Sequence, residues 1–115
     1  MRTRSVFAAA GIVLLSLGTA QAQTVATDAD GMTLYTFDKD SGGTSTCYDQ
    51  CAENWPPALG QADSDMEEGW TLVERTDGTM QRAYDGKPVY RYVGDQKPGD
   101  ATGDGKGDVW HVLTR

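Results

Sequence analysis

Cys47 and Cys51, four positions apart, carry the most reactive side chains in the sequence. Residues at this spacing share one face of a helical turn, where their separation suits a disulfide bond. The same two thiols could instead bind a soft metal such as Cu(I), with His111, the single histidine, as a third ligand. A thiol-redox role is less favoured because the Cys-x-x-Cys spacing is absent. The spacing therefore predicts a local disulfide and leaves a copper-handling or redox accessory as the alternative.

A glycine-rich stretch near the C-terminus, residues 98–108, carries three aspartates at intervals of four: Asp100, Asp104 and Asp108. Oxygen ligands in a flexible loop can surround Ca²⁺, which makes a calcium-dependent binding module a further alternative. The ligand order of an EF-hand and its closing glutamate are absent, however. The stretch is therefore expected to be a solvated loop.

Other familiar chemistries lack their residues. A Ser–His–Asp site would have to use His111 as its base, and the sequence contains no nucleophile elbow. The glycines do not have the spacing of a phosphate-binding loop. Among 17 acidic residues, no pair is singled out for glycoside cleavage. We therefore expect no catalytic residue and no cofactor.

One pattern occurs twice, at residues 30–40 and again at residues 85–95, an offset of 55 positions. Each copy contains Asp-Gly, a tyrosine, a second aromatic residue and a closing aspartate, and each is followed by a tryptophan. The first copy supplies Tyr35, Phe37, Asp40 and Trp55, and the second supplies Tyr90, Tyr92, Asp95 and Trp110. Self-similarity at a fixed period indicates two related halves, and it favours a shared core role for these aromatic residues over an exposed sugar-stacking face.

The elements expected around these residues are short. Alternation predicts about six strands, mainly antiparallel, and Asp77-Gly78 predicts a hairpin turn between two of them. Asp40 and Asp95 are expected to close the turns that follow the aromatic strands. The strands are expected near residues 32–37, 70–75, 80–84, 89–93 and 109–113, with one helical turn within 46–54. The fold class is therefore mostly β, a small antiparallel sheet domain of two pseudo-repeated halves.

The N-terminus has the features of a secretory signal peptide: a short basic start, an apolar run of about 12 residues and the sequence Ala20-Gln21-Ala22. Residues 1–22 are therefore expected to be removed. The rest, residues 23–115, is expected to form one β domain made of repeat 1 (30–57), a hairpin connector (58–84) and repeat 2 (85–112).

The remaining chain is strongly acidic, with 8 basic and 17 acidic residues, so 8 − 17 = −9. Such a charge repels nucleic acid and anionic membrane surfaces. An apolar run of this length is also too short for a membrane span, so none is expected after cleavage. The protein is expected to be periplasmic or secreted, where oxidising conditions support a disulfide.

The two copies of the pattern, Tyr-x-Phe-x-x-Asp at 35–40 and Tyr-x-Tyr-x-x-Asp at 90–95, resemble a known signature. It belongs to bacterial predicted lipoproteins with a Yx(FWY)xxD motif, also described as secreted repeats of unknown function. The resemblance extends to Cys47–Ala52 followed by Trp55-Pro56, and it covers roughly residues 30–112. The leader differs, since no cysteine stands near the cleavage point for lipid attachment. The resemblance implies an envelope protein and no particular activity.

These observations together favour an exported, non-enzymatic structural or binding module. Its partner is expected to be another envelope protein or a small ligand.

Overall fold

The computed structural model describes residues 24–60 and 67–115. The predicted signal peptide, residues 1–22, and its cleavage site lie outside these ranges. Within them, no helix has both the length and the apolar character that crossing a membrane requires.

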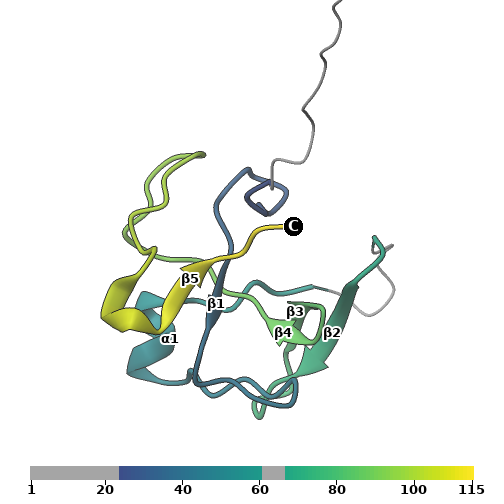
Figure 1. Cartoon of the computed structure of the whole chain (residues 1–115). Coiled ribbons are helices and arrows are strands. Elements are labelled where there is room, and N and C mark those ends of the chain that lie inside the picture. Colours follow the sequence, from purple (N-terminus) through teal and green to yellow (C-terminus); the bar gives the residue numbers. More distant parts are fainter. Residues whose placement is uncertain (1–23, 61–66) are drawn as a thin grey trace, which may run out of the picture.

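Two small antiparallel sheets form the domain (Figure 1). One pairs β1 with β5, and the other has the order β2-β3-β4. The elements are β1 (Tyr35–Phe37), α1 (Gln50–Asn54), β2 (Trp70–Glu74), β3 (Met80–Tyr84), β4 (Lys87–Pro88), η2 (Lys106–Asp108) and β5 (Trp110–Val112). This arrangement confirms the predicted mostly β fold. The described ranges hold five strands where about six were expected, and α1 lies inside the predicted helical segment.

The β2–β3 hairpin forms where Asp77-Gly78 predicts it. Gly78 has a φ of 87°, a conformation that glycine adopts without steric cost, and its N–H donates to the carbonyl of Arg75. The Asp77 carboxylate accepts hydrogen bonds from the backbone and the hydroxyl of Thr79. The turn is therefore closed by both backbone and side-chain bonds.

The predicted strand 89–93 is wrong, and the reason lies in its partner. Residues 90–92 run beside Trp55–Pro57, just as β1 runs beside β5, 55 positions away in each case. The Arg91 N–H donates to the carbonyl of Pro56, and Tyr90 forms a single bridge with Pro57. Pro56 stands where β5 has His111, opposite Arg91, and because proline has no N–H it cannot donate a hydrogen bond back to Arg91. A regular strand therefore does not form, and β4 covers Lys87–Pro88 only.

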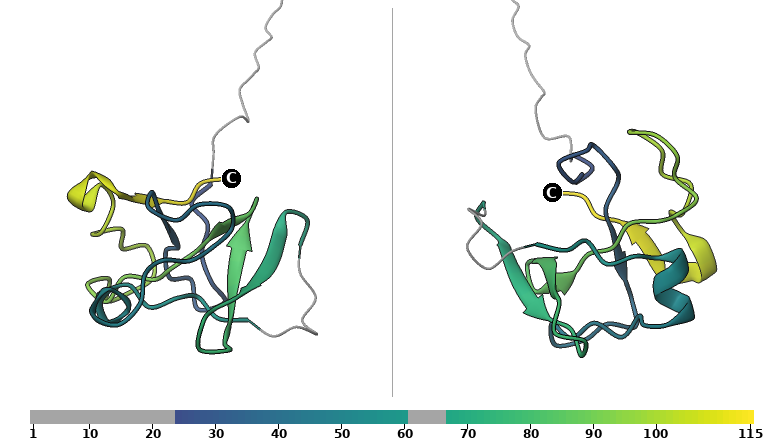
Figure 2. Two further views of the ribbon diagram at one scale, coloured as in Figure 1. Left: turned by 90° about the horizontal axis from the view of Figure 1, so that it is seen from below. Right: turned by 180° about the vertical axis from the view of Figure 1, so that it is seen from behind.

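Alternating side chains divide the interior into two clusters. Leu34 and Val89 point into one cluster, while their neighbours Tyr35 and Tyr90 point into the other. The first cluster consists of Ala26, Leu34, Ala58, Trp70, Val89 and Leu113, and the second of Tyr35, Cys47, Trp55, Tyr90 and Trp110. Two further views show β1 in the middle of the domain, with β5 on one side of it and the β2–β3 hairpin on the other (Figure 2).

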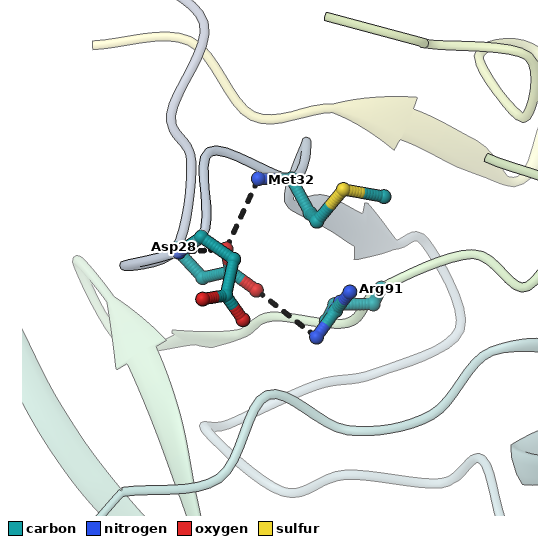
Figure 3. A network of polar contacts seen from close by, with 4 residues as sticks. Asp28, Met32 and Arg91 are labelled. Atoms are coloured by element: carbon teal, nitrogen blue, oxygen red, sulfur yellow. Dashed lines mark hydrogen bonds and ion pairs between the residues drawn. The ribbon is translucent and has the colours of Figure 1, made fainter. Parts of the chain in front are cut away.

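The two ends of the described chain lie together. Thr24 and Arg115 exchange a pair of backbone hydrogen bonds, each 2.9 Å long. Close by, the Asp28 carboxylate accepts the N–H of Met32 and pairs with Arg91 at 3.3 Å (Figure 3). This ion pair joins the N-terminal loop to the second half of the chain.

Candidate functional site

The two tyrosines of the duplicated pattern meet at the centre of the molecule. The Tyr35 N–H donates to the Tyr90 carbonyl at 2.8 Å, and the Tyr90 N–H donates to the Tyr35 carbonyl at 2.9 Å. Such a reciprocal pair is the unit of an antiparallel ladder. It places equivalent residues of the two halves face to face, so a local pseudo-two-fold axis passes between them.

The tyrosine hydroxyls cross this axis. Tyr35 Oη donates to Oδ2 of Asp95 at 2.6 Å, and Tyr90 Oη donates to Oδ2 of Asp40 at 2.7 Å. Each tyrosine therefore bonds the aspartate of the other half, although the aspartate of its own copy is only five residues away. We call Tyr35–Asp95 and Tyr90–Asp40 the crossed pairs.

The second oxygen of each aspartate closes a loop in its own half. Asp40 Oδ1 accepts the N–H and the hydroxyl of Thr46, and Asp95 Oδ1 accepts the same two groups of Thr102. The turn-closing role expected for both aspartates is therefore present, together with the unexpected bond to the other half. Thr46 and Thr102 are 56 positions apart, so the offset of 55 shifts by one residue in these loops.

Burial and hydrogen bonding perturb the ionisation of the crossed pairs. Burial raises the pKa of Tyr35 and of Tyr90, and the adjacent carboxylates raise both pKa values further. Burial alone would raise the pKa of Asp95, but hydrogen bonds from Thr102 and Tyr35 outweigh it and hold that pKa below its ordinary value. At neutral pH the pair Tyr35–Asp95 therefore consists of a neutral phenol that donates to a carboxylate, and Tyr90 is likewise a neutral phenol that donates to Asp40.

Four aromatic rings stack across the same axis. Trp55 and Trp110 lie face to face at the middle, with centroids 3.8 Å apart and planes 2° apart. Phe37 stacks on the outer face of Trp110 at 4.1 Å, and Tyr92 stacks on Trp55 at 4.3 Å. Each outer ring thus packs on the tryptophan of the other half. Trp55, Trp110 and the crossed tyrosines are buried and form a core, whereas the two outer rings of the stack, Phe37 and Tyr92, are half-buried.

A cavity adjoins the outer ring at each end of the stack. The cavity beside Phe37 measures about 270 Å³ and lies between residues 36–43 and Gly86–Pro88. The cavity beside Tyr92 is lined by Pro56, Pro57, Arg91, Val93 and Asp95 as well. The two surround equivalent residues, 36–40 in the first half and 91–95 in the second, with different linings.

The duplicated geometry agrees with a comparison of the sequence with known families. A family described as a secreted repeat of unknown function matches the chain at residues 16–59 and 71–114. The two matches start 55 positions apart (71 − 16) and together cover more than half of the chain. The chain belongs to this family. No curated protein and no solved structure matches it.

Each crossed pair therefore joins one secreted repeat to the other, since Tyr35 and Asp40 lie in the first match and Tyr90 and Asp95 in the second. The bounds predicted for the repeats, 30–57 and 85–112, lie inside the matched ranges and stay a prediction.

Arg75, outside the duplicated pattern, completes the first crossed network. Only 4% of its surface is exposed, and its Nη1 donates to Ser45 Oγ at 2.9 Å and to Gln81 Oε1 at 2.8 Å. Ser45 Oγ in turn contacts Tyr90 Oη. Since the single Tyr90 proton goes to Asp40, Ser45 donates to Tyr90 and accepts from Arg75. Two hydroxyls thus connect a buried cation to a carboxylate, which strengthens each bond in the chain.

The second secreted repeat uses a different donor at the same point. There the N–H of Gly103 donates to Tyr35 Oη at 3.2 Å, where the first repeat has the Ser45 hydroxyl. Sequence reasoning missed Arg75, Ser45 and Gly103. A comparison of positions 55 residues apart finds only residue types that recur, and none of these three recurs at the equivalent position.

The two cysteines form the predicted disulfide, with an S–S distance of 2.02 Å and a Cα–Cα distance of 5.3 Å. Both sulfurs are therefore bonded to each other and are not thiolates. His111 lies in β5, and its Nε2 contacts Asp38 Oδ2 at 2.8 Å. The structure does not bring His111 and the cysteines together as a copper site, because within the described residues no group of three such side chains is placed to hold a metal.

The three aspartates proposed for calcium are also separate. Asp100 Oδ2 accepts the N–H groups of Gln96 and Lys97, while Asp104 Oδ1 accepts the N–H of Val112. Asp108 is the last residue of η2 and has a φ of 61°. These carboxylates shape the glycine-rich loop individually and do not converge on one point within the part of the chain that the structure describes.

Proposed function

We propose that this secreted repeat protein is a non-enzymatic module of the bacterial envelope, in which the duplicated tyrosines and aspartates lock two half-domains into one rigid body. Their role is structural, and a ligand or partner binds without hydrogen bonds to these tyrosine and aspartate side chains.

The crossed pairs are the observation that supports this proposal. A catalytic acid or base needs an oxygen within reach of a substrate. Tyr35 and Tyr90 are fully buried, Asp95 is 7% exposed, and each aspartate already accepts three hydrogen bonds. The polar groups that the sequence repeats are therefore committed to internal bonds.

The remaining properties agree with an exported module. The family is a secreted one, and the chain forms a disulfide, which persists in an oxidising compartment. We place the protein in the periplasm or outside the cell, free of a membrane span once the leader is removed.

Replacing Tyr35 with phenylalanine tests the structural role, because the substitution deletes one hydroxyl and keeps the ring. Tyr35→Phe leaves the Asp95 carboxylate and the Gly103 N–H without their partner, so we expect the free energy of unfolding to fall by about 1.5–3 kcal/mol. Tyr48→Phe is the matched control, since its hydroxyl only accepts the exposed N–H of Thr76 at 3.1 Å. Urea unfolding of both variants measures the difference. Equal stability of Tyr35→Phe and the wild type would refute a locking role.

A further inference from the structure

The cavity beside Phe37 is built by two glycines that face each other. A Cβ added to Gly86 would meet no atom within 4 Å, and one added to Gly43 would lie 3.5 Å from the Gly86 carbonyl oxygen. Both glycines have positive φ, 77° at Gly43 and 81° at Gly86, which disfavours any larger residue at either position. The space of about 270 Å³ is thus held open by backbone conformation.

In the second half, the place that corresponds to these two glycines is filled, and the cavity beside Tyr92 lies next to Pro56 and Pro57 instead. Gly31 is the counterpart of Gly86, and Pro98 is the counterpart of Gly43 at the offset of 55. The Pro98 ring stands over Gly31, since a Cβ added to Gly31 would lie 3.2 Å from Pro98 Cβ. Of the two equivalent pairs of positions, Gly31 with Pro98 is therefore closed by the proline ring, whereas Gly86 with Gly43 is open.

The open cavity combines one aromatic ring with hydrogen-bond donors and hydrogen-bond acceptors. Phe37 is half-buried and held rigid by its stack on Trp110, and it lines the cavity. The side chain of Asp38 is 54% exposed and offers Oδ1 as an acceptor, since its Oδ2 contacts His111, and the exposed Lys87 offers ammonium donors. The hydroxyls of Thr36 and Ser41 can both donate and accept. Ligand sites typically combine an apolar surface with a few polar groups in this way, and the volume suits a small ligand.

We propose that this cavity binds a neutral saccharide unit, with Phe37 as the apolar platform and Asp38 and Lys87 as the polar rim. The C–H face of a sugar ring packs against the negative face of an aromatic ring. Its hydroxyls can donate to Asp38 and accept from Lys87.

Charged ligands fit the same cavity less well. An anion is repelled by Asp38 and Asp40 in a chain of strongly negative net charge, and a cation, although the carboxylates attract it, is repelled by Lys87. A neutral polyhydroxy ligand uses both signs of charge without repulsion from either. This role goes beyond the locking function proposed above and does not depend on it.

The test is a ¹H–¹⁵N NMR titration of the processed protein with glucose, galactose and N-acetylglucosamine, and separately with glycine, acetate and methylammonium as charged probes. We expect at least one saccharide to shift the amides of Gly42, Gly43 and Gly86 saturably. The amides of residues 91–95 should stay in place, because the cavity in that half is lined differently.

Substitutions taken from the other half provide the variants. Asp38→Val with Lys87→Met introduces the residues that stand at the equivalent positions, Val93 and Met32. Since both replaced side chains are exposed, the melting temperature should stay nearly unchanged. Affinity for the saccharide should fall about tenfold or more, as two polar contacts are lost. Val93→Asp, the reverse change in the second half, is the control and should bind like the wild type.

Three results would overturn the proposal. One is the absence of a saturable shift with every saccharide at hundreds of millimolar. Another is tighter binding of a charged probe than of any saccharide. The third is unchanged saccharide affinity in the folded double variant.

Discussion

The two halves of this protein are nearly identical where they touch and different where they face solvent. The shared contacts have matching lengths: 2.6 and 2.7 Å for the crossed pairs, and 5.2 Å for the edge-on contact of each tyrosine with the tryptophan of its own half. Away from the axis, the first half has a disulfide, a proline pair and a cavity bounded by two glycines, while the second has β5, a glycine-rich loop and Pro98. A residue on the axis must fit its own counterpart, so one change disturbs both halves. A residue in an outer loop carries no such constraint.

The largest effect is expected at the middle of the ring stack. Trp55→Ala or Trp110→Ala removes a buried ring that packs on three others, and each should lower the free energy of unfolding by about 3–5 kcal/mol. Because the halves are equivalent here, the two losses should agree within about 1 kcal/mol. Urea unfolding measures both. If one substitution is tolerated, the stack does not hold the halves equally.

A somewhat smaller loss should follow from Arg75→Leu, which affects only the network of one crossed pair, Tyr90–Asp40. It leaves Ser45, Gln81 and the Cys47 carbonyl without a donor in a buried position, so we expect a loss of about 2–3 kcal/mol. Arg82→Leu is the control, since Arg82 lies half-buried over the Trp70 ring and should cost less than about 1 kcal/mol. Similar losses in the two variants would mean that the Arg75 network adds no stability.

Removal of the disulfide tests another feature that the first half has and the second half lacks. The loop between Cys47 and Cys51 is short, so the Cys47→Ser, Cys51→Ser variant should lose about 2 kcal/mol. The mature fold should persist, because the second half keeps its shape without a disulfide. Thermal unfolding with and without reductant measures the change, and reductant should leave the double-serine variant unaffected. Complete unfolding of the wild type by reductant would contradict this view.

The smallest effects near neutral pH come from ionisation of the crossed pairs. The Asp95 pKa is lowered in the folded state, so its stabilisation is present above the ordinary aspartate pKa of about 4 and is lost as the pH falls through the lower folded value. The pKa values of Tyr35 and Tyr90 are raised, so their stabilisation is present below about pH 10 and is lost as the pH rises further.

Urea unfolding should therefore show a free energy of unfolding that is constant near neutral pH and declines at both acid and alkaline pH. Asp95→Asn should weaken the decline of this free energy at acid pH. The decline at alkaline pH should remain, because it then depends mainly on Tyr90. If the free energy of unfolding of this variant declined at acid pH as steeply as that of the wild type, Asp95 would not contribute to the decline.

The sequence alone predicts the mostly β fold, the hairpin at Asp77-Gly78 and the disulfide, because each depends on residues close together in the chain. It cannot predict which aspartate each tyrosine bonds. Asp40 lies five positions from Tyr35 and Asp95 lies sixty, and only the reciprocal backbone pair of Tyr35 and Tyr90 brings the distant one into reach.

The prediction of a strand at residues 89–93 is wrong for the same reason, namely a contact between residues far apart in the chain. Pro56 and Pro57 are plain in the sequence, but their effect on Arg91 and Tyr90 depends on a pairing that no local pattern reveals. Arg75 is hidden for a related reason: it completes a network at Ser45 and Tyr90 from outside both copies.

Double-mutant cycles on the tyrosines and aspartates test the central claim most directly. Urea unfolding of Tyr35→Phe, Asp95→Asn and the double variant should give a coupling energy of about 1–3 kcal/mol. The cycle of Tyr35→Phe with Asp40→Asn, its neighbour in the same copy, should be additive within about 0.5 kcal/mol. The opposite result, coupling to Asp40 and additivity with Asp95, would show that each half closes on itself and would contradict the crossed architecture.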